Sequence, residues 1–136
     1  MNCIFCKIIE GQIPSKKVYE NSKILAFYDI NPQAPIHILV IPKVHISSVD
    51  EINEGNSSII ADIFANIPKI AEHAGIRGGY RVVSNFGENA CQSVPHLHFH
   101  ILGGEKLSEK MAKGEPLTDE VLREIFSKHT AGENDD

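Results

Sequence analysis

The sequence predicts an α+β fold in which a five-stranded antiparallel sheet carries one long helix and short helices at the two ends of the chain. Short β-branched, apolar runs follow one another with loops between most of them, without the helical crossovers that parallel strands need. Between residues 57 and 74 an apolar residue recurs every third or fourth position, and Gly75 follows, which predicts the long helix. The length of 136 residues suits one domain, expected to cover residues 1–136.

A short helix is predicted at the start of the chain, because Ile4, Phe5 and Ile8 have helical spacing and Gly11 is a natural stop. The strands are predicted from their apolar and β-branched residues at 16–21, 24–30, 36–42, 80–85 and 96–102. The turn-forming residues Asn21 and Ser22, where the first strand gives way to the second, favour a hairpin.

The C-terminal part of the chain predicts a short packed helix over residues 118–129. Thr118 is a suitable cap, and Val121, Leu122 and Ile125 share one side. The last residues, 130–136, are small, polar and acidic, so we expect them to be disordered.

The composition excludes several classes of partner. A formal net charge of −5 opposes binding to the phosphates of a long nucleic acid, although a small phosphorylated molecule could still be held by backbone amides and histidines. No apolar run approaches the roughly 20 residues of a membrane helix. The first residues lack the features of a secretory signal, and three cysteines suit a reducing compartment, so we expect a cytoplasmic protein.

The segment HLHFHIL places His96, His98 and His100 at alternate positions, which puts them on one face of an extended chain. They could hold a catalytic metal, include a nucleophile with its supporting groups, or form a polar outer face. Same-face neighbours on a strand lie roughly 6.5 Å apart, so one ion is usually reached by only two of them. A neutral imidazole can attack phosphorus, and the preceding loop offers hydroxyl, amide and backbone donors for phosphate. His37, in an apolar strand, is most simply a hydrogen-bonded core residue.

Cys3 and Cys6 form a C-x-x-C pair, which is half of a common zinc site. The pair could instead be two small residues near a helix start or a thiol redox pair. His45 and His96 are the candidates that would complete a structural Cys₂His₂ zinc site.

Four segments together resemble the histidine-triad (HIT) family, specifically its nucleotide-binding, purine nucleoside phosphoramidase branch. They are IFCKIIEGQIP, LAFYDINPQAPIHILVIPKVHI, RVVSN and QSVPHLHFHILGG. The resemblance runs from about Cys3 to Gly104. It implies a HIT-like fold and a hydrolase that cleaves nucleoside 5′-phosphoramidates, or related nucleoside monophosphate esters, at the α-phosphorus. The reaction would pass through a covalent nucleotidyl-histidine and release a nucleoside monophosphate.

The resemblance also implies roles for individual residues. His98 matches the nucleophile, His100 a phosphate contact, His37 the histidine that supports the nucleophile, and Ser93 the hydroxyl near the leaving group. Asp29 matches the carboxylate that binds the ribose hydroxyls. Residues of the phosphate site are matched by Asn85 and Gln92, and the apolar purine slot is matched by Ile4, Phe5, Ile8, Ile13, Phe27 and Ile30, each of which could also be core packing.

The family resemblance supports a structural zinc ion on Cys3, Cys6, His45 and His96, and a homodimer that joins two sheets beside the long helix. Close relatives often have two glycines where this chain has Ala90 and Cys91, so either the loop shape differs or glycine is not required. Alternative functions are a dinucleoside polyphosphate hydrolase, a nucleotidyltransferase, or a non-catalytic nucleotide-binding regulatory module.

Overall fold

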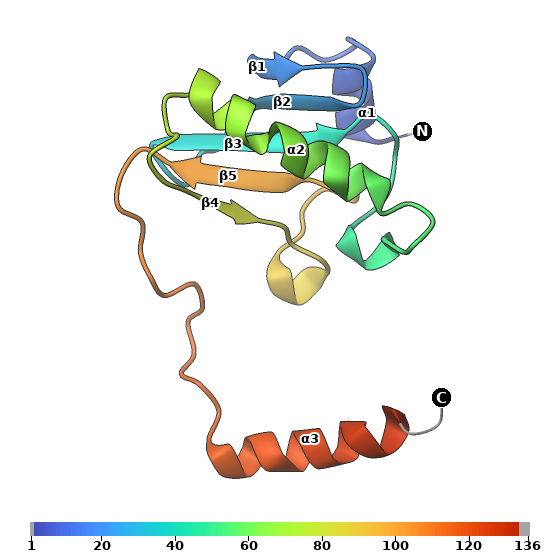
Figure 1. The fold of residues 1–136 in the computed structure, drawn as a ribbon, viewed down its shortest axis with the longest axis vertical. Helices are drawn as coiled ribbons and strands as arrows, with labels where there is room; N and C mark the ends of the chain where they lie inside the picture. The colour runs from blue at the N-terminus through green and yellow to red at the C-terminus, as the bar shows by residue number, and fades with distance from the viewer. Residues whose placement is uncertain (1, 134–136) are drawn as a thin grey trace. The chain divides into compact units, whose positions relative to one another are not determined.

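A five-stranded antiparallel sheet with the strand order β1-β2-β3-β5-β4 forms the centre of the fold (Figure 1). The strands are β1 (Lys17–Glu20), β2 (Ile24–Tyr28), β3 (Ile36–Pro42), β4 (Tyr80–Val83) and β5 (Phe99–Gly103). The α+β class and the antiparallel sheet are thus confirmed. Because β3 pairs with β2 on one side and β5 on the other, it lies in the middle of the sheet.

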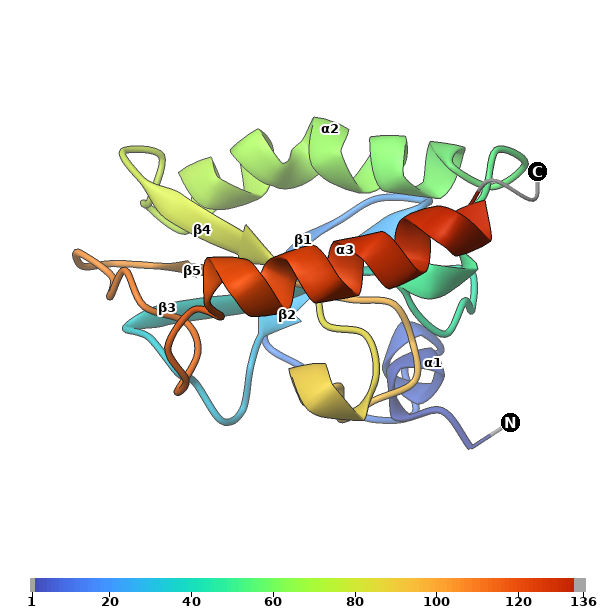
Figure 2. The ribbon, with the colours of Figure 1, turned by 90° about the horizontal axis from the view of Figure 1, so that it is seen from below.

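Helices cover the two faces of this sheet. The long helix α2 (Ser58–His73) lies over one face, and the short helix α1 (Ile4–Ile9) lies at the other (Figure 2). Two single-turn 3₁₀ helices, η1 (Val49–Glu51) and η2 (Glu88–Ala90), lie in the loops before α2 and before β5. Both sheet faces therefore need apolar side chains.

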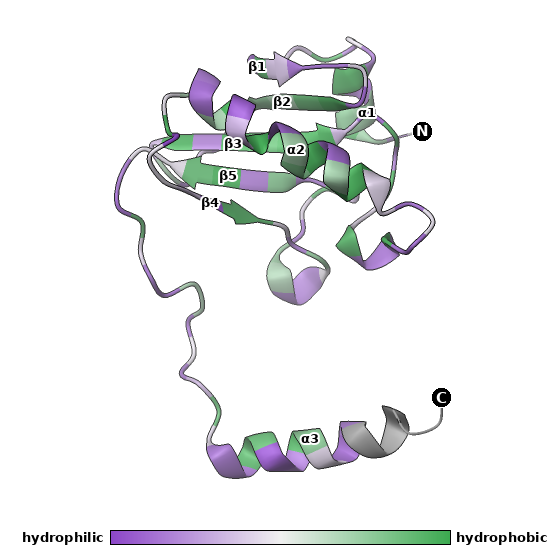
Figure 3. Cartoon of the chain, in the orientation of Figure 1, coloured by the Kyte–Doolittle hydropathy of each residue, from purple (hydrophilic) through white to green (hydrophobic). Residues whose placement is uncertain are grey.

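Alternation along the strands supplies both faces. In β3, Ile38 and Val40 join the core cluster under α2, whereas Leu39 and Ile41 join the cluster under α1. Hydrophobic residues accordingly fill most of β2, β3 and β5, with hydrophilic interruptions in β3 and β5 (Figure 3). His37 and His100 are those polar positions, and the period of two places them on the α1 face with Leu39.

The fifth strand is shorter than predicted. It begins at Phe99 rather than at His96, because the backbone groups of residues 96–98 bond elsewhere. The N–H of Leu97 donates to the Ile46 carbonyl at 2.6 Å, and the His98 carbonyl accepts from the Ser84 hydroxyl at 2.9 Å. The alternation of side chains nevertheless continues, since Leu97, Phe99 and Ile101 all enter the core under α2.

The computed structural model describes residues 2–133, with only the backbone for residues 130–133, and the chain divides into two units. The first ends at Lys106 and holds the sheet; the second begins at Leu107 and contains α3 (Asp119–Glu133). Both predicted terminal helices are confirmed, and Thr118 caps α3 through a 3.3 Å bond from the Val121 N–H. Three expectations stay predictions: one domain over the whole chain, packing of α3, and disorder of residues 130–136. Residues 134–136 lie outside the described part. None of the described helices is long and apolar enough to cross a membrane.

Gly104, directly after β5, has a φ of 92°, and an added Cβ would lie 3.0 Å from the Pro35 Cβ. Gly75, after α2, has a φ of 75° but open space around the Cβ position. We therefore expect Gly104→Ala to lower the free energy of unfolding by about 2–3 kcal/mol, and Gly75→Ala by only about 1 kcal/mol. Urea unfolding measures both, and equal losses would contradict the packing role of Gly104.

Candidate functional site

A cavity of about 330 Å³ opens on the α1 face of the sheet. Its apolar wall comes from α1, the segment after α1, β2, the loop after β2, and β3, and consists of Ile4, Phe5, Ile8, Ile13, Pro14, Phe27, Tyr28, Ile30 and Leu39. The remaining lining residues are Ser15, Asp29, Ser93, Val94, His98 and His100. All six residues predicted to form an apolar slot thus lie around one cavity together with two histidines of the triad.

These apolar residues serve both packing and the cavity wall. Phe5, Ile8 and Phe27 belong to the core cluster under α1, and each is less than one tenth exposed. Phe5 also meets His98 edge to face, with the ring centroids 5.2 Å apart. Ile30, by contrast, is 99% exposed and lies at the rim. The cavity therefore combines a fixed inner wall with an exposed side chain at its mouth.

The ring of His98 is held by the backbone of His96. His98 Nδ1 lies 2.7 Å from the His96 carbonyl oxygen, and a carbonyl only accepts, so Nδ1 carries the proton. This assignment leaves a lone pair on Nε2 of a neutral ring. Burial lowers the pKa of His98 below its ordinary value, against the opposing effect of the His96 carbonyl. A buried histidine in this state can act as a nucleophile.

His37 and His100 form a second hydrogen-bonded pair. The backbone N–H of Gln33 donates to His37 Nδ1 at 3.0 Å, so His37 carries its proton on Nε2. That Nε2–H points to His100 Nδ1, 2.8 Å away, and lies 3.4 Å from Asp29 Oδ2. His100 must then carry its own proton on Nε2, which lies 3.4 Å from Asn85 Nδ2, and since both atoms would donate, the Asn85 amide can accept this proton only through its oxygen after a flip. The chain of bonds fixes the tautomers of both rings.

Burial and the neighbouring histidines keep this pair neutral. Burial, with smaller contributions from His98 and His37, lowers the pKa of His100 to about 4. Burial likewise lowers the pKa of His37, although the Asp29 carboxylate opposes this shift. His100 can therefore donate one hydrogen bond as a neutral ring at pH 7.

Asp29, His37 and His100 also offer three ligand atoms within 4.8 Å of one another, the arrangement of a metal centre. A histidine that binds metal through Nε2 normally donates its Nδ1–H to an acceptor. His37 Nδ1 instead accepts from the Gln33 N–H. This cluster is thus arranged for hydrogen bonding, not for metal binding.

Cys3, Cys6, His45 and His96 form a different cluster, whose four ligand atoms also lie within 4.8 Å of one another. Cys3 Sγ is 3.3 Å from His96 Nδ1, Cys6 Sγ is 3.3 Å from His45 Nδ1, and the two Nδ1 atoms are 3.1 Å apart. Zinc–sulfur bonds of about 2.3 Å and zinc–nitrogen bonds of about 2.0 Å place tetrahedral ligand atoms about 3.3–3.8 Å apart. The four residues predicted from the sequence therefore fit a zinc ion.

The surroundings of His96 strengthen this fit. The ring is fully buried, and its Nε2 lies 3.0 Å from the Pro42 carbonyl oxygen, which accepts the ring proton. The Nδ1 lone pair is consequently directed at the two sulfur atoms, as in zinc sites whose histidines are oriented by a backbone carbonyl. Cys3 is also the N-cap of α1, since its Sγ accepts from the Cys6 N–H at 3.3 Å.

The loop before β5 contains Gln92, one of the two residues predicted for the phosphate site. The Gln92 side chain is used to hold the loop: its Nε2 donates to the Ser47 and Val94 carbonyls at 2.8 and 3.0 Å, and its Oε1 accepts from the Gly87 N–H. The cavity wall does not include Gln92 or Asn85, although Asn85 contacts His100.

Cys91 has a φ of 63°, the left-handed conformation that glycine adopts most easily, whereas Ala90 ends η2. Among the described residues, Cys91 is the only non-glycine residue with a positive φ. The loop thus keeps a left-handed residue at one of the two positions where relatives often have glycine.

Several residues that shape the site were not predicted. Leu39 could have been found, because it lies two positions after His37 in β3 and so shares its face. Ser84 and Gln33 act through contacts that join distant segments, and Gln33 contributes only its backbone N–H. Sequence spacing gives no signal for such contacts.

Comparison with known proteins identifies relatives of similar length. The family model of the HIT domain matches residues 10–107. A protein named "Uncharacterized HIT-like protein" from Buchnera aphidicola subsp. Baizongia pistaciae is 49% identical over 107 residues, which cover 78% of this chain and 96% of the relative. The "14 kDa zinc-binding protein" of Zea mays is 47% identical over 107 residues, covering 77% and 84% of the two chains.

A solved structure of a HIT family hydrolase from Clostridium thermocellum has a TM-score of 0.78 and 48% identity, and the match covers 82% of this chain and 97% of that one. The similarity therefore includes both the sequence and the arrangement of the sheet and helices. On the matched family model and these relatives, this chain belongs to the HIT domain family.

Proposed function

We propose that the protein hydrolyses nucleoside 5′-phosphoramidates, or related nucleoside monophosphate esters, through a covalent nucleotidyl-histidine on His98. The observation that carries the proposal is the 2.7 Å bond from His98 Nδ1 to the His96 carbonyl, which keeps a neutral ring with its Nε2 lone pair at a cavity of about 330 Å³. HIT family hydrolases among the structural relatives support the general class of reaction.

The proposed substrate lies with its purine against the apolar wall formed by α1 and β2. The wall contains Phe5 and Phe27, whose rings meet edge to face at 5.7 Å, and such a surface favours a flat apolar ring system. Asp29 lines the same cavity and would accept hydrogen bonds from the ribose hydroxyls. The α-phosphate then lies against the cavity-facing edges of His98 and His100, which are adjacent rings with centroids 5.1 Å apart.

In the first step, Nε2 of His98 attacks the α-phosphorus and the bond from phosphorus to the leaving amine breaks. His100 donates its Nε2–H to a phosphate oxygen as a neutral ring, and the leaving amine takes a proton from a solvent water on the side of Ser93, a proton that the attacking water of the second step returns to the solvent. In the second step, water attacks phosphorus, the phosphorus–His98 bond breaks, and a nucleoside monophosphate is released. The net reaction adds one water to the phosphoramidate bond.

We also propose a structural zinc ion on Cys3, Cys6, His45 and His96, as the metal-binding name of the maize relative suggests. Zinc would supply a fixed tetrahedral centre and no chemistry at phosphorus. Its proposed effect passes through His96, which would be held by the ion at Nδ1 and would present its carbonyl to His98.

We further propose that the protein is cytoplasmic and forms a homodimer joined along an edge of the sheet.

Replacing the nucleophile tests the reaction directly. His98→Asn should lower kcat for a nucleoside phosphoramidate by on the order of 10³-fold or more, because no other group can form the covalent bond. Binding of the monophosphate product should change little. Mass spectrometry of rapidly quenched wild-type enzyme should detect a nucleotide adduct on His98, and turnover by the variant without an adduct would exclude this mechanism.

Assays with dinucleoside polyphosphates and with acceptors other than water separate the two enzyme alternatives, and binding without turnover indicates a regulatory module.

Removing a thiol tests the metal. Cys6→Ser should lose the bound zinc measured by elemental analysis, and the melting temperature should fall by at least about 5 °C, because metal binding stabilises only the folded chain. Cys91→Ser is the matched control, since Cys91 is exposed and outside the cluster. Wild-type protein purified without metal but with two reactive thiols would favour a redox pair instead.

The protonation state of His100 can be measured by NMR. Since its pKa is lowered to about 4, the His100 ring should stay neutral as the pH falls from 8 to 5, and its ring signals should shift only below pH 5. A midpoint close to the ordinary value of about 6.5 would contradict the lowering of the His100 pKa by burial.

A further inference from the structure

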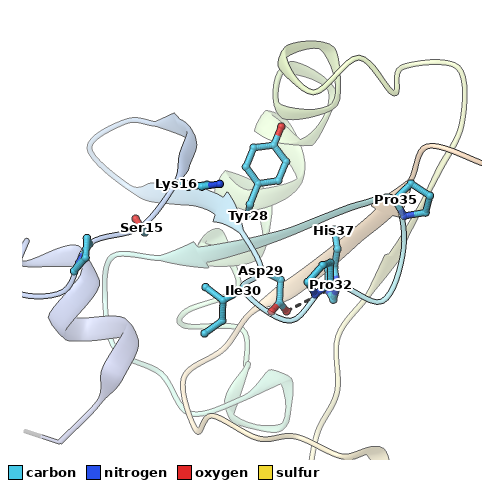
Figure 4. A pocket seen from close by; sticks show the side chains of 9 residues that line it. Ser15, Lys16, Tyr28, Asp29, Ile30, Pro32, Pro35 and His37 are labelled. Atoms are coloured by element: carbon cyan, nitrogen blue, oxygen red, sulfur yellow. Dashed lines mark ion pairs between the residues drawn. The ribbon is translucent and has the colours of Figure 1, made fainter.

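A second cavity of about 750 Å³ lies beside the one proposed to bind the nucleotide (Figure 4). Of the two cavities, only this one is lined by Lys16, Pro32, Pro35 and His37, and both are lined by Pro14, Ser15, Tyr28, Asp29 and Ile30. Ser15 and Lys16 come from the segment before β1, Tyr28 ends β2, and Asp29 and Ile30 lie on the loop after β2 (Figure 4). The function proposed above makes no use of this space.

The shared residues show on which side of the nucleotide the second cavity lies. It does not include His98, His100 or Ser93, which surround the proposed phosphate position, and it does not include the inner base-slot residues of α1. It includes Asp29, which is proposed to bind the ribose. The second cavity therefore continues from the sugar, on the side of its 2′ and 3′ oxygens.

Ser15 lies on the wall between the two cavities, and its hydroxyl has no partner. Among the described residues, Ser15 Oγ is the one buried side-chain nitrogen or oxygen atom without a hydrogen bond. An unsatisfied buried hydroxyl lowers stability, so such groups commonly bind a ligand or water. A change of the Ser15 side-chain rotamer would turn this buried hydroxyl toward the cavities, where it could donate to an oxygen atom of a ligand.

Lys16 gives the second cavity a cation. Within the described part of the chain its ammonium group takes part in no ion pair, whereas the next residue, Lys17, pairs with Glu20 at 3.0 Å. The carboxylate of Asp29 is already engaged, because its Oδ1 accepts from the Asn31 N–H at 2.8 Å and its Oδ2 lies 3.4 Å from His37 Nε2. The cavity therefore holds one carboxylate, which is already hydrogen-bonded, and one cation, and Lys16 is the group that can attract an anion.

We propose that the second cavity binds a phosphate carried on the 2′ or 3′ oxygen of the ribose, with Lys16 as its cation and Ser15 as a hydrogen-bond donor. This inference rests on the proposed function, because it assumes that the ribose lies at Asp29. It extends the substrate class from simple nucleoside phosphoramidates to nucleotides that are also phosphorylated on the sugar. One ribose hydroxyl remains available to Asp29.

Calorimetric titration with three adenosine ligands tests the proposal. Adenosine 3′,5′-bisphosphate or adenosine 2′,5′-bisphosphate should bind wild-type protein about fivefold or more tightly than 5′-AMP, and the better of the two identifies the oxygen that faces the cavity. The difference should shrink as salt is added, since Lys16 is exposed to solvent. Equal or weaker binding of both bisphosphates would overturn the proposal.

Two matched substitutions assign the effect to this cavity. Lys16→Gln should abolish the advantage of the bisphosphate and leave the affinity for 5′-AMP unchanged. Lys17→Gln removes the same charge one residue away, from a side chain paired with Glu20, and should keep the advantage. Equal losses in the two variants would mean that the effect is only general attraction by positive charge.

Ser15→Ala separates ligand binding from a structural role. It should reduce the advantage of the bisphosphate without lowering the melting temperature, because the hydroxyl has no partner within the described chain. A clear fall in the melting temperature with unchanged binding would exclude Ser15 from the site.

The outcomes also distinguish this inference from the function on which it rests. Suppose that 5′-AMP binds and that adenosine 5′-phosphoramidate gives a nucleotide adduct on His98, but that the bisphosphates bind no more tightly than 5′-AMP. In that case only the second cavity is wrongly assigned. If neither 5′-AMP nor GMP binds, the proposed function itself fails.

Discussion

The hydrogen bond from the ring of His98 to the carbonyl of its neighbour His96 is the interaction on which the site depends. It determines which nitrogen of His98 carries the proton and therefore which nitrogen keeps its lone pair. A bond to the backbone two residues away leaves the ring little freedom. Anything that moves the His96 backbone would therefore change the aim of the proposed nucleophile.

His96 is in turn held by burial and by contacts at both of its ring nitrogens. Its ring is buried, its Nε2 bonds to the Pro42 carbonyl at the end of β3, and its Nδ1 faces Cys3 and Cys6. Cys3 also caps α1, the helix that supplies Ile4, Phe5 and Ile8 to the cavity. One cluster of side chains thus connects the proposed nucleophile with the proposed base slot, and the proposed zinc ion would act on the site through this connection without taking part in the chemistry.

Burial has two opposite consequences for the histidines of the site. It disfavours the charged form, so the pKa values of His37, His98 and His100 all fall. It also makes an unpaired ring nitrogen costly, so the rings bond to one another and to the backbone. The result is a set of neutral rings with assigned tautomers, which suits nucleophilic attack and hydrogen-bond donation at pH 7.

The sequence alone determined the fold class, the five strands, the long helix and the four residues of the Cys/His cluster. It could do so because alternation in strands, helical spacing and C-x-x-C are local patterns, and because several motifs together resembled one family. It misplaced the start of β5, and it did not separate Gln92, which holds its loop, from residues that line the cavity. Ser15, Gln33 and Ser84 also needed the structure. Only the tertiary structure decided these points. They depend on contacts between segments that are distant in the sequence, and the spacing of residues along the chain does not predict such contacts. The hydrogen bonds of Gln33 and Ser84 and the unpaired buried hydroxyl of Ser15 are the examples.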